Sequence, residues 1–90
     1  MLLVSYDISN DKLRTRFSKY LSKFGHRMQY SLFEINNSSR ILKLIQIEIK
    51  NKYSKQFEET DSIMIFQMSV SCQITKYGYA KHQDEDLVLF

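Results

Sequence analysis

A single aspartate, Asp7, follows a mostly apolar segment at residues 1–6, and its position suits metal chemistry. An apolar run of this kind predicts a buried central strand, so the carboxylate would lie at the mouth of a sheet. Carboxylate oxygens suit hard cations such as Mg²⁺, which keep several of their waters. One carboxylate is a weak site, but two copies of Asp7 brought together across a two-fold axis would make a plausible one. The alternative is an aspartate that caps a helix or closes a turn.

A second set of residues is basic and repeats with helical spacing. One face of the expected helix carries Lys12, Arg16, Lys19 and Lys23, and Arg14 lies on the other flank. At the rise of an α-helix, this ridge is roughly 16 Å long. Phosphates along a duplex are spaced on a comparable scale, so the ridge could follow a nucleic-acid backbone without reading its sequence. The alternative is a lysine-rich helix face that only meets solvent.

A third candidate is the segment 27–34, which is rich in aromatic and β-prone residues and predicts a strand. One face of that strand would carry Arg27, Gln29, Ser31 and Phe33, and the other Met28, Tyr30, Leu32 and Glu34. The first face could bind phosphate or water near Asp7. The competing interpretation is that Tyr30 and Phe33 are core and interface aromatics.

The elements that must position these residues follow from the apolar spacing. After the strand at 1–6 we expect a helix over 11–24, closed by Gly25 in the left-handed conformation, and a strand over 27–35. A second helix runs from 41 to about 53, although residues 45–49 also alternate as a strand would. Strands over 62–68, 73–77 and 87–90 follow. This order fits an α+β fold, a ferredoxin-like βαββαβ sandwich with an extra short C-terminal strand, if 27–35 is bent into two pieces or pairs directly with 62–68.

Length and charge narrow the class of protein. Ninety residues make one domain, 1–90, whose stability would gain from pairing with a second copy. Residues 1–56 hold 11 Lys/Arg and 4 Asp/Glu, a net +7, whereas residues 57–90 hold 2 and 6, a net −4. The basic half favours a polyanionic partner. The last strand could add to the edge of a partner's sheet, which is a route to a homodimer.

Several chemistries and locations are disfavoured by what the chain holds. Two glycines cannot build a dinucleotide or Walker loop, and one cysteine with two histidines does not make a zinc site. Cys72 is interpreted as a buried small hydrophobe, with a reactive thiol as the alternative. No segment has the apolar length of a signal peptide or a membrane span, so we expect the cytoplasm and no membrane partner.

Taken together, the residues resemble the CRISPR-associated protein 2 family. The resemblance covers essentially the whole chain, and its most specific part is the hydrophobic strand with the arginines and the Gln-Tyr-Ser-x-Phe-Glu run that follow it. Its residues are Tyr6-Asp7-Ile8-Ser9, Asp11, Arg14, Arg16, Gly25, Arg27 and Gln29-Tyr30-Ser31-Leu32-Phe33-Glu34. The resemblance implies a ferredoxin-like homodimer whose C-terminal strand packs on the other protomer.

The resemblance also implies a role and a set of site residues. The role is spacer acquisition in CRISPR adaptation, in which the dimer bridges two copies of the integrase, of the CRISPR-associated protein 1 family, and holds duplex DNA. Some members are metal-dependent nucleases on RNA or duplex DNA, which implies Mg²⁺ or another divalent cation held by Asp7. Positions linked to that activity match Tyr6, Arg14, Arg16, Arg27 and Phe33. A purely structural adapter and a toxin-like ribonuclease of the same fold are the alternatives.

Overall fold

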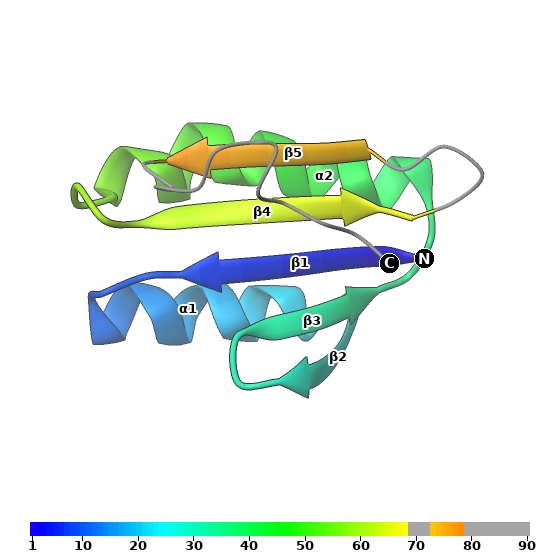
Figure 1. The fold of residues 1–90 in the computed structure, drawn as a ribbon, viewed down its shortest axis with the longest axis horizontal. Coiled ribbons are helices and arrows are strands. Elements are labelled where there is room, and N and C mark those ends of the chain that lie inside the picture. Colours follow the sequence, from blue (N-terminus) through cyan, green and yellow to red (C-terminus); the bar gives the residue numbers. More distant parts are fainter. Residues whose placement is uncertain (69–72, 79–90) are drawn as a thin grey trace.

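Two helices cover one face of an antiparallel sheet in the computed structural model, which describes residues 1–68 and 73–78 (Figure 1). The strand order is β2-β3-β1-β4-β5, with β1 at the centre. The helices and strands are β1 (Leu2–Asp7), α1 (Asp11–Leu21), β2 (Gly25–Gln29), β3 (Leu32–Ile35), α2 (Ser39–Glu48), β4 (Ser62–Gln67) and β5 (Gln73–Gly78). A π-helical turn, η1 (Ile49–Tyr53), and a 3-10 turn, η2 (Ser54–Gln56), extend α2.

The ferredoxin-like prediction is confirmed. The elements from β1 to β4 follow the order βαββαβ, and β5 adds to the edge of the sheet beside β4. The predicted strand 73–77 is β5, which extends one residue further. Two other predictions, the strand at 87–90 and the burial of Cys72, concern residues outside the described ranges.

The pleat of β1 sends neighbouring side chains to opposite faces of the sheet. Leu2, Val4 and Tyr6 point into the core and are at most 4% exposed, whereas Asp7 is exposed. Asp7 is the last residue of the strand and pairs with Ser62, the first residue of β4. The predicted position of Asp7 at the end of a buried strand is therefore confirmed.

The first helix begins with an asparagine cap and carries the expected apolar stripe. The side chain of Asn10 accepts a hydrogen bond of 2.9 Å from the backbone of Leu13, which satisfies one free N–H of the first turn. Leu13 and Phe17 are buried on the face that meets the sheet. The helix ends at Leu21, short of the predicted boundary, and Ser22 is its C-cap. The prediction that Gly25 caps it is wrong, because Gly25 does not have a positive φ and instead begins β2.

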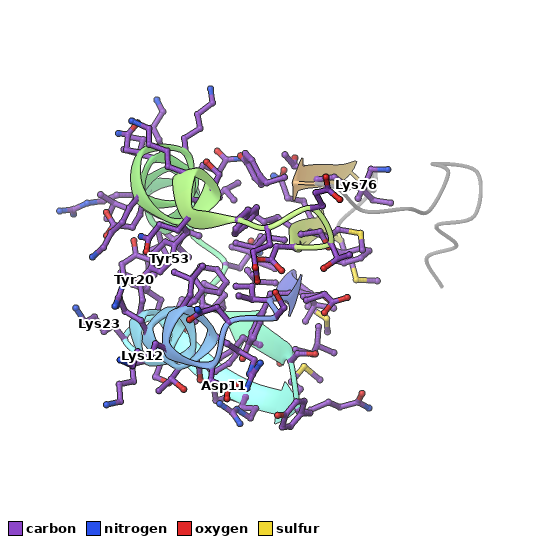
Figure 2. The ribbon with its side chains drawn as sticks, turned by 90° about the vertical axis from the view of Figure 1, so that its left-hand side faces the viewer. Asp11, Lys12, Tyr20, Lys23, Tyr53 and Lys76 are labelled. Atoms are coloured by element: carbon purple, nitrogen blue, oxygen red, sulfur yellow. The ribbon has the colours of Figure 1, made fainter. Side chains whose placement is uncertain are left out.

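The second helix confirms the helical interpretation of residues 41–53. Ser38 caps it by accepting from the backbone of Ile41, and Ile45 and Ile49 are fully buried. The π-helical turn directs Tyr53 into the core, where the centre of its ring lies 4.8 Å from the centre of the Phe17 ring. This contact joins the end of the second helix to α1, and Figure 2 shows Tyr53 beside Tyr20 between the two helices. Neither α1 nor α2 is long and apolar enough to span a membrane, and no other helix in the described ranges is.

The segment 27–35 is not one continuous strand. It breaks at Tyr30 and Ser31 into the hairpin of β2 and β3, with a register shift between Arg27 and Gln29. The break is stabilised by a backbone hydrogen bond of 3.1 Å from Tyr6 to the carbonyl of Ser31. Phe33 is 1% exposed and belongs to the core as predicted, but Tyr30 is 75% exposed and does not.

Gly25 is needed because β2 and β3 approach closely at its position. A Cβ there would lie 2.0 Å from the backbone oxygen of Glu34, which cannot move without distorting the strand pairing. We predict that Gly25→Ala lowers the free energy of unfolding by roughly 1–3 kcal/mol, as overpacking does elsewhere. Urea unfolding at matched protein concentration measures this. Gln29→Ala, at an exposed position of the same strand, is the control, and equal unfolding midpoints for the two variants would refute the argument.

Candidate functional site

A concave site opens where the end of β1 meets α1 and the β2–β3 turn. Its volume is about 190 Å³, and its lining residues are Tyr6, Arg14, Thr15, Ser18, Arg27 and Tyr30. These side chains carry two guanidinium groups and four hydroxyl groups, and none of the lining residues in the described chain carries a carboxylate. A guanidinium is always charged and only donates hydrogen bonds. The lining therefore suits an anion, and we call the cavity the arginine pocket.

Arg27 is held over the pocket by a serine and an aromatic ring. Its guanidinium donates a hydrogen bond to Oγ of Ser18 on α1 and lies 5.4 Å from the centre of the Phe33 ring. Arg27 and Phe33 face each other because they are paired across β2 and β3. Ser18 is 8% exposed and was not among the predicted site residues. A serine facing the core side of an apolar helical stripe is the only signal that the sequence holds for it.

Arg14 is fixed at the connection between β1 and α1. Its guanidinium donates a hydrogen bond of 2.9 Å to the carbonyl of Ile8 and forms an ion pair with Asp11. The hydrogen bond that Arg14 donates to the Asp11 carboxylate raises the pKa of the guanidinium, which stays charged. The side chain of Asp11 is 86% exposed, and exposed ion pairs contribute little free energy. The ion pair with Asp11 therefore holds the Arg14 guanidinium only weakly.

Tyr6 and Phe33 form the apolar support under the two arginines. Tyr6 is 4% exposed, and its ring centre lies 5.3 Å from that of Phe17 and 6.3 Å from that of Phe33. Tyr6 reaches the pocket lining, whereas Phe33 does not. Of the predicted activity-linked positions, the structure thus brings Tyr6, Arg14 and Arg27 together and places Phe33 beneath Arg27.

Asp7 lies at the same end of β1 but on the other face of the sheet. Tyr6 points toward the helices, so the next side chain points away from them. Within residues 1–68 and 73–78, no group of three or more His, Cys, Asp and Glu side chains is placed to hold a metal ion. Asp7 is therefore separate from the arginine pocket and belongs to no such group among the described residues.

Arg16 belongs to the basic ridge, not to the arginine pocket. Lys12, Arg16 and Lys19 line one shallow surface of α1 together with Asp11 and Thr15. All ridge residues are exposed. Lys23 continues the ridge, with its ammonium 5.8 Å from the centre of the Tyr20 ring, and Figure 2 shows it on the helix side of the molecule. The predicted split between the ridge and Arg14 on the opposite flank is confirmed.

Asp61 is a functional candidate that sequence reasoning missed. Its carboxylate is completely buried and accepts hydrogen bonds of 2.9 Å from the backbone and the hydroxyl of Ser9 and from the backbone of Glu58. It thereby ties the start of β4 to the loop between β1 and α1. Burial alone would raise the pKa of Asp61, but the hydrogen bonds from Glu58 and Ser9 outweigh it and hold the pKa below its ordinary 3.8.

We predict that Asp61→Asn lowers the free energy of unfolding at neutral pH by about 1–3 kcal/mol, because one amide oxygen cannot serve both Ser9 and Glu58. The pKa of Asp61 is lower in the folded than in the unfolded chain, so the ionised form stabilises the fold above pH 3.8. This contribution disappears as the pH falls through the folded pKa. Denaturant unfolding from neutral to acidic pH should show the gap between wild type and variant narrowing on acidification. A gap that is absent or independent of pH contradicts this role, and Glu59→Gln, at an exposed site, is the control.

Comparison with known proteins agrees with the fold and the site. The family model described as CRISPR associated protein Cas2 matches residues 1–75, a range that contains every residue of the arginine pocket. The CRISPR-associated endoribonuclease Cas2 2 of Methanospirillum hungatei is 32% identical over 79 residues, 86% of this chain and 84% of the relative. The CRISPR-associated endoribonuclease Cas2 1 of Archaeoglobus fulgidus is 38% identical over 76 residues, 81% of this chain and 76% of the relative. The chain belongs to the CRISPR associated protein Cas2 family.

Proposed function

We propose that the protein is a nucleic-acid-binding subunit of a CRISPR system and a divalent-cation-dependent endonuclease, a phosphodiesterase that acts on RNA or duplex DNA. The observation that carries the proposal is the arginine pocket, where Arg14 and Arg27 converge without a carboxylate among the lining residues. A phosphodiester is an anion that two guanidinium groups bind with matched geometry. The two relatives compared above are named endoribonucleases, which supports the same class of reaction.

In this proposal the residues of the arginine pocket bind and orient the phosphodiester. Arg14 and Arg27 contact its oxygens and stabilise charge that develops there during cleavage. Ser18 and Phe33 hold Arg27 in place, and the carbonyl of Ile8 holds Arg14. Their positions are set before substrate arrives, which is what electrostatic stabilisation requires.

We further propose that the protein works as a homodimer whose protomers pack through the uncovered face of the sheet. In the described chain, both helices lie on the other face (Figure 2). Paired residues share a face, so the uncovered face carries apolar side chains on β1, β3, β4 and β5 together with the polar residues Ser5, Glu34 and Lys76. Its apolar side chains are half-buried: Leu3, Leu32, Met64, Phe66 and Ile74. Asp7 lies on this face as well, so pairing through it would bring the two Asp7 side chains of the dimer toward one another.

Asp7 is the residue that would hold a divalent cation such as Mg²⁺. Asp7 suits this role because its exposed carboxylate offers oxygen ligands to a hard cation and leaves room for coordinated waters. The Asp7 of a partner protomer would supply the second carboxylate. When bound, such a cation polarises a phosphoryl oxygen and lowers the pKa of a coordinated water.

A second candidate function is a structural adapter in spacer acquisition, which binds duplex DNA and the integrase of the CRISPR-associated protein 1 family without cleaving. The basic ridge favours it, because Lys12, Arg16 and Lys19 form an exposed surface that adjoins the arginine pocket at Thr15 and shares no basic residue with it. Backbone contacts of this kind position a duplex without sequence readout. The two functions use different residues, so one protein can perform both.

We predict that variants separate these roles in assays of cleavage and binding with Mg²⁺, single-stranded RNA and duplex DNA. Arg27→Ala should slow cleavage roughly 100-fold to 1,000-fold, as loss of a charge-stabilising donor does. Asp7→Ala should abolish cleavage and leave binding intact. Lys12→Glu combined with Lys19→Glu should weaken duplex binding. The plot of log affinity against log salt concentration should become less steep by about 2, because each lost lysine–phosphate contact contributes about 0.9 to the slope.

The control for the double ridge variant is Lys43→Glu, which changes an exposed lysine on α2. Sedimentation of the same preparations tests the dimer. Undiminished cleavage by Asp7→Ala or Arg27→Ala would overturn the enzymatic proposal. Unchanged duplex binding by the ridge variant would overturn the adapter.

A further inference from the structure

Tyr30 is the most exposed large apolar or aromatic side chain in the described part of the chain. It is 75% exposed, whereas the next such residues, Met1 and Ile47, are each 50% exposed. An exposed aromatic side chain needs no explanation when it stands alone. Tyr30 does not stand alone, because it lines the arginine pocket together with Arg14 and Arg27.

The backbone around Tyr30 is held firmly. Tyr30 lies in the turn between paired strands, with Gln29 and Leu32 paired on either side of it. The next residue, Ser31, accepts a backbone hydrogen bond of 3.1 Å from Tyr6 of the central strand. The backbone that carries the aromatic ring is therefore fixed at the rim of a cavity lined by the guanidinium groups of Arg14 and Arg27.

We propose that Tyr30 stacks on the base of the nucleotide whose phosphate lies between Arg14 and Arg27. The inference rests on the proposed nucleic-acid function and adds to it a base-stacking role for Tyr30 and a preference for unpaired nucleotides. Aromatic rings next to a basic groove bind single strands because every base has a π-face to stack on. A base within a continuous duplex is already stacked on its neighbours and paired. The arginine pocket therefore prefers an unpaired nucleotide, and the ridge on α1 is left for the backbone of a duplex.

The location of Tyr30 favours nucleic acid over a second protomer as its partner. The pocket it lines also contains Tyr6, on the face of the sheet that the helices cover, and Ser18, on α1. The apolar surface proposed for dimerisation lies on the opposite face. The neighbours of Tyr30 across the cavity are cationic and hydroxyl groups, which match a phosphate and not an apolar protein surface.

The test uses the full-length protein, two variants of Tyr30, and two strands with the same phosphates. One strand is a short thymidine oligonucleotide, and the other is an abasic strand of equal length. We expect Tyr30→Leu to bind the thymidine strand about fivefold to 100-fold more weakly, which is the range of one base–aromatic stack. Its affinity for the abasic strand and for a duplex closed by hairpins should equal that of wild type. Tyr30→Phe, which keeps the ring, should retain wild-type binding of both strands.

A spectroscopic readout separates stacking from a merely structural role. A strand with 2-aminopurine in place of one base should lose fluorescence when it binds wild type or Tyr30→Phe, and should lose less with Tyr30→Leu. Ile47→Ala, at an exposed apolar position on α2, is the matched control and should change nothing.

Each outcome decides between the claims. Equal affinity of Tyr30→Leu and wild type for the thymidine strand overturns the stacking role. The stacking role is also overturned if Tyr30→Leu loses as much affinity for the abasic strand as for the thymidine strand. It is overturned as well if the dimer dissociates in Tyr30→Leu but not in Tyr30→Phe, since that result assigns Tyr30 to the dimer interface. Arg27→Ala separates a failure of the proposed function from a failure of the stacking role, because the proposed function predicts that this variant binds both strands more weakly. If Arg27→Ala binds both strands normally, the proposed function fails whatever Tyr30 does.

Discussion

The buried carboxylate of Asp61 fixes the segment from which all candidate site residues on β1 and α1 are positioned. It holds Ser9 by the backbone and the hydroxyl, directly after the strand that ends at Asp7. The following residue, Asn10, caps α1, and the carbonyl of Ile8 holds Arg14. An ionised carboxylate survives without solvent contact only when hydrogen bonds satisfy it, and three of them do so here. The geometry of the site thus depends on one buried charge that lies 52 residues away from Ser9 in the sequence.

The alternation of β1 then divides the chemistry between two faces of the sheet. Tyr6 points toward the helices and helps to build the arginine pocket, whereas Asp7 points to the uncovered face. The exposed Asp11 that pairs with Arg14 lies outside the lining of the arginine pocket, and the separation of Asp7 keeps a further carboxylate away from the guanidinium groups. It also leaves Asp7 on the surface where a second copy can supply another carboxylate. In the proposed function, phosphate binding and cation-dependent chemistry therefore lie on different sides of one strand end.

Much of the fold follows from local sequence signals. The stripe of Leu13 and Phe17 predicts α1, and the apolar run before Asp7 predicts the central strand. The alternative in which 27–35 is bent into two pieces is confirmed, but the sequence did not place the break at Tyr30. Neither this position nor the role of Gly25 followed, because both depend on pairing partners: Tyr6 holds the hairpin turn, and the backbone of Glu34 excludes a side chain at Gly25. A glycine before a strand looks the same in sequence whether it caps a helix or accommodates a close approach.

The candidate site was predictable in its residue types and in part of its grouping. Helical spacing predicts that Arg14 and Arg16 reach different surfaces, because two helical positions correspond to a rotation of about 200°. Arg14 lines the arginine pocket, and Arg16 lies on the ridge. The convergence of Arg14 with Arg27 was not predictable, because it depends on how β2 packs beside α1. Asp61 gave no signal and Ser18 only its place beside the apolar stripe of α1. An aspartate before a strand and a serine in a helix are common, and the importance of these two comes from tertiary contacts.

The measurement that tests the arginine pocket most directly is a titration of the side-chain Nε–Hε NMR signals with a thymidine dinucleotide, which carries one internucleotide phosphate. The chain has four arginines, at positions 14, 16, 27 and 40, so each signal can be assigned by substitution. If a phosphate binds between Arg14 and Arg27, their two signals shift together along one binding curve while those of Arg16 and Arg40 stay in place. A titration in which Arg14 and Arg27 do not respond, or in which Arg16 alone does, would contradict the account.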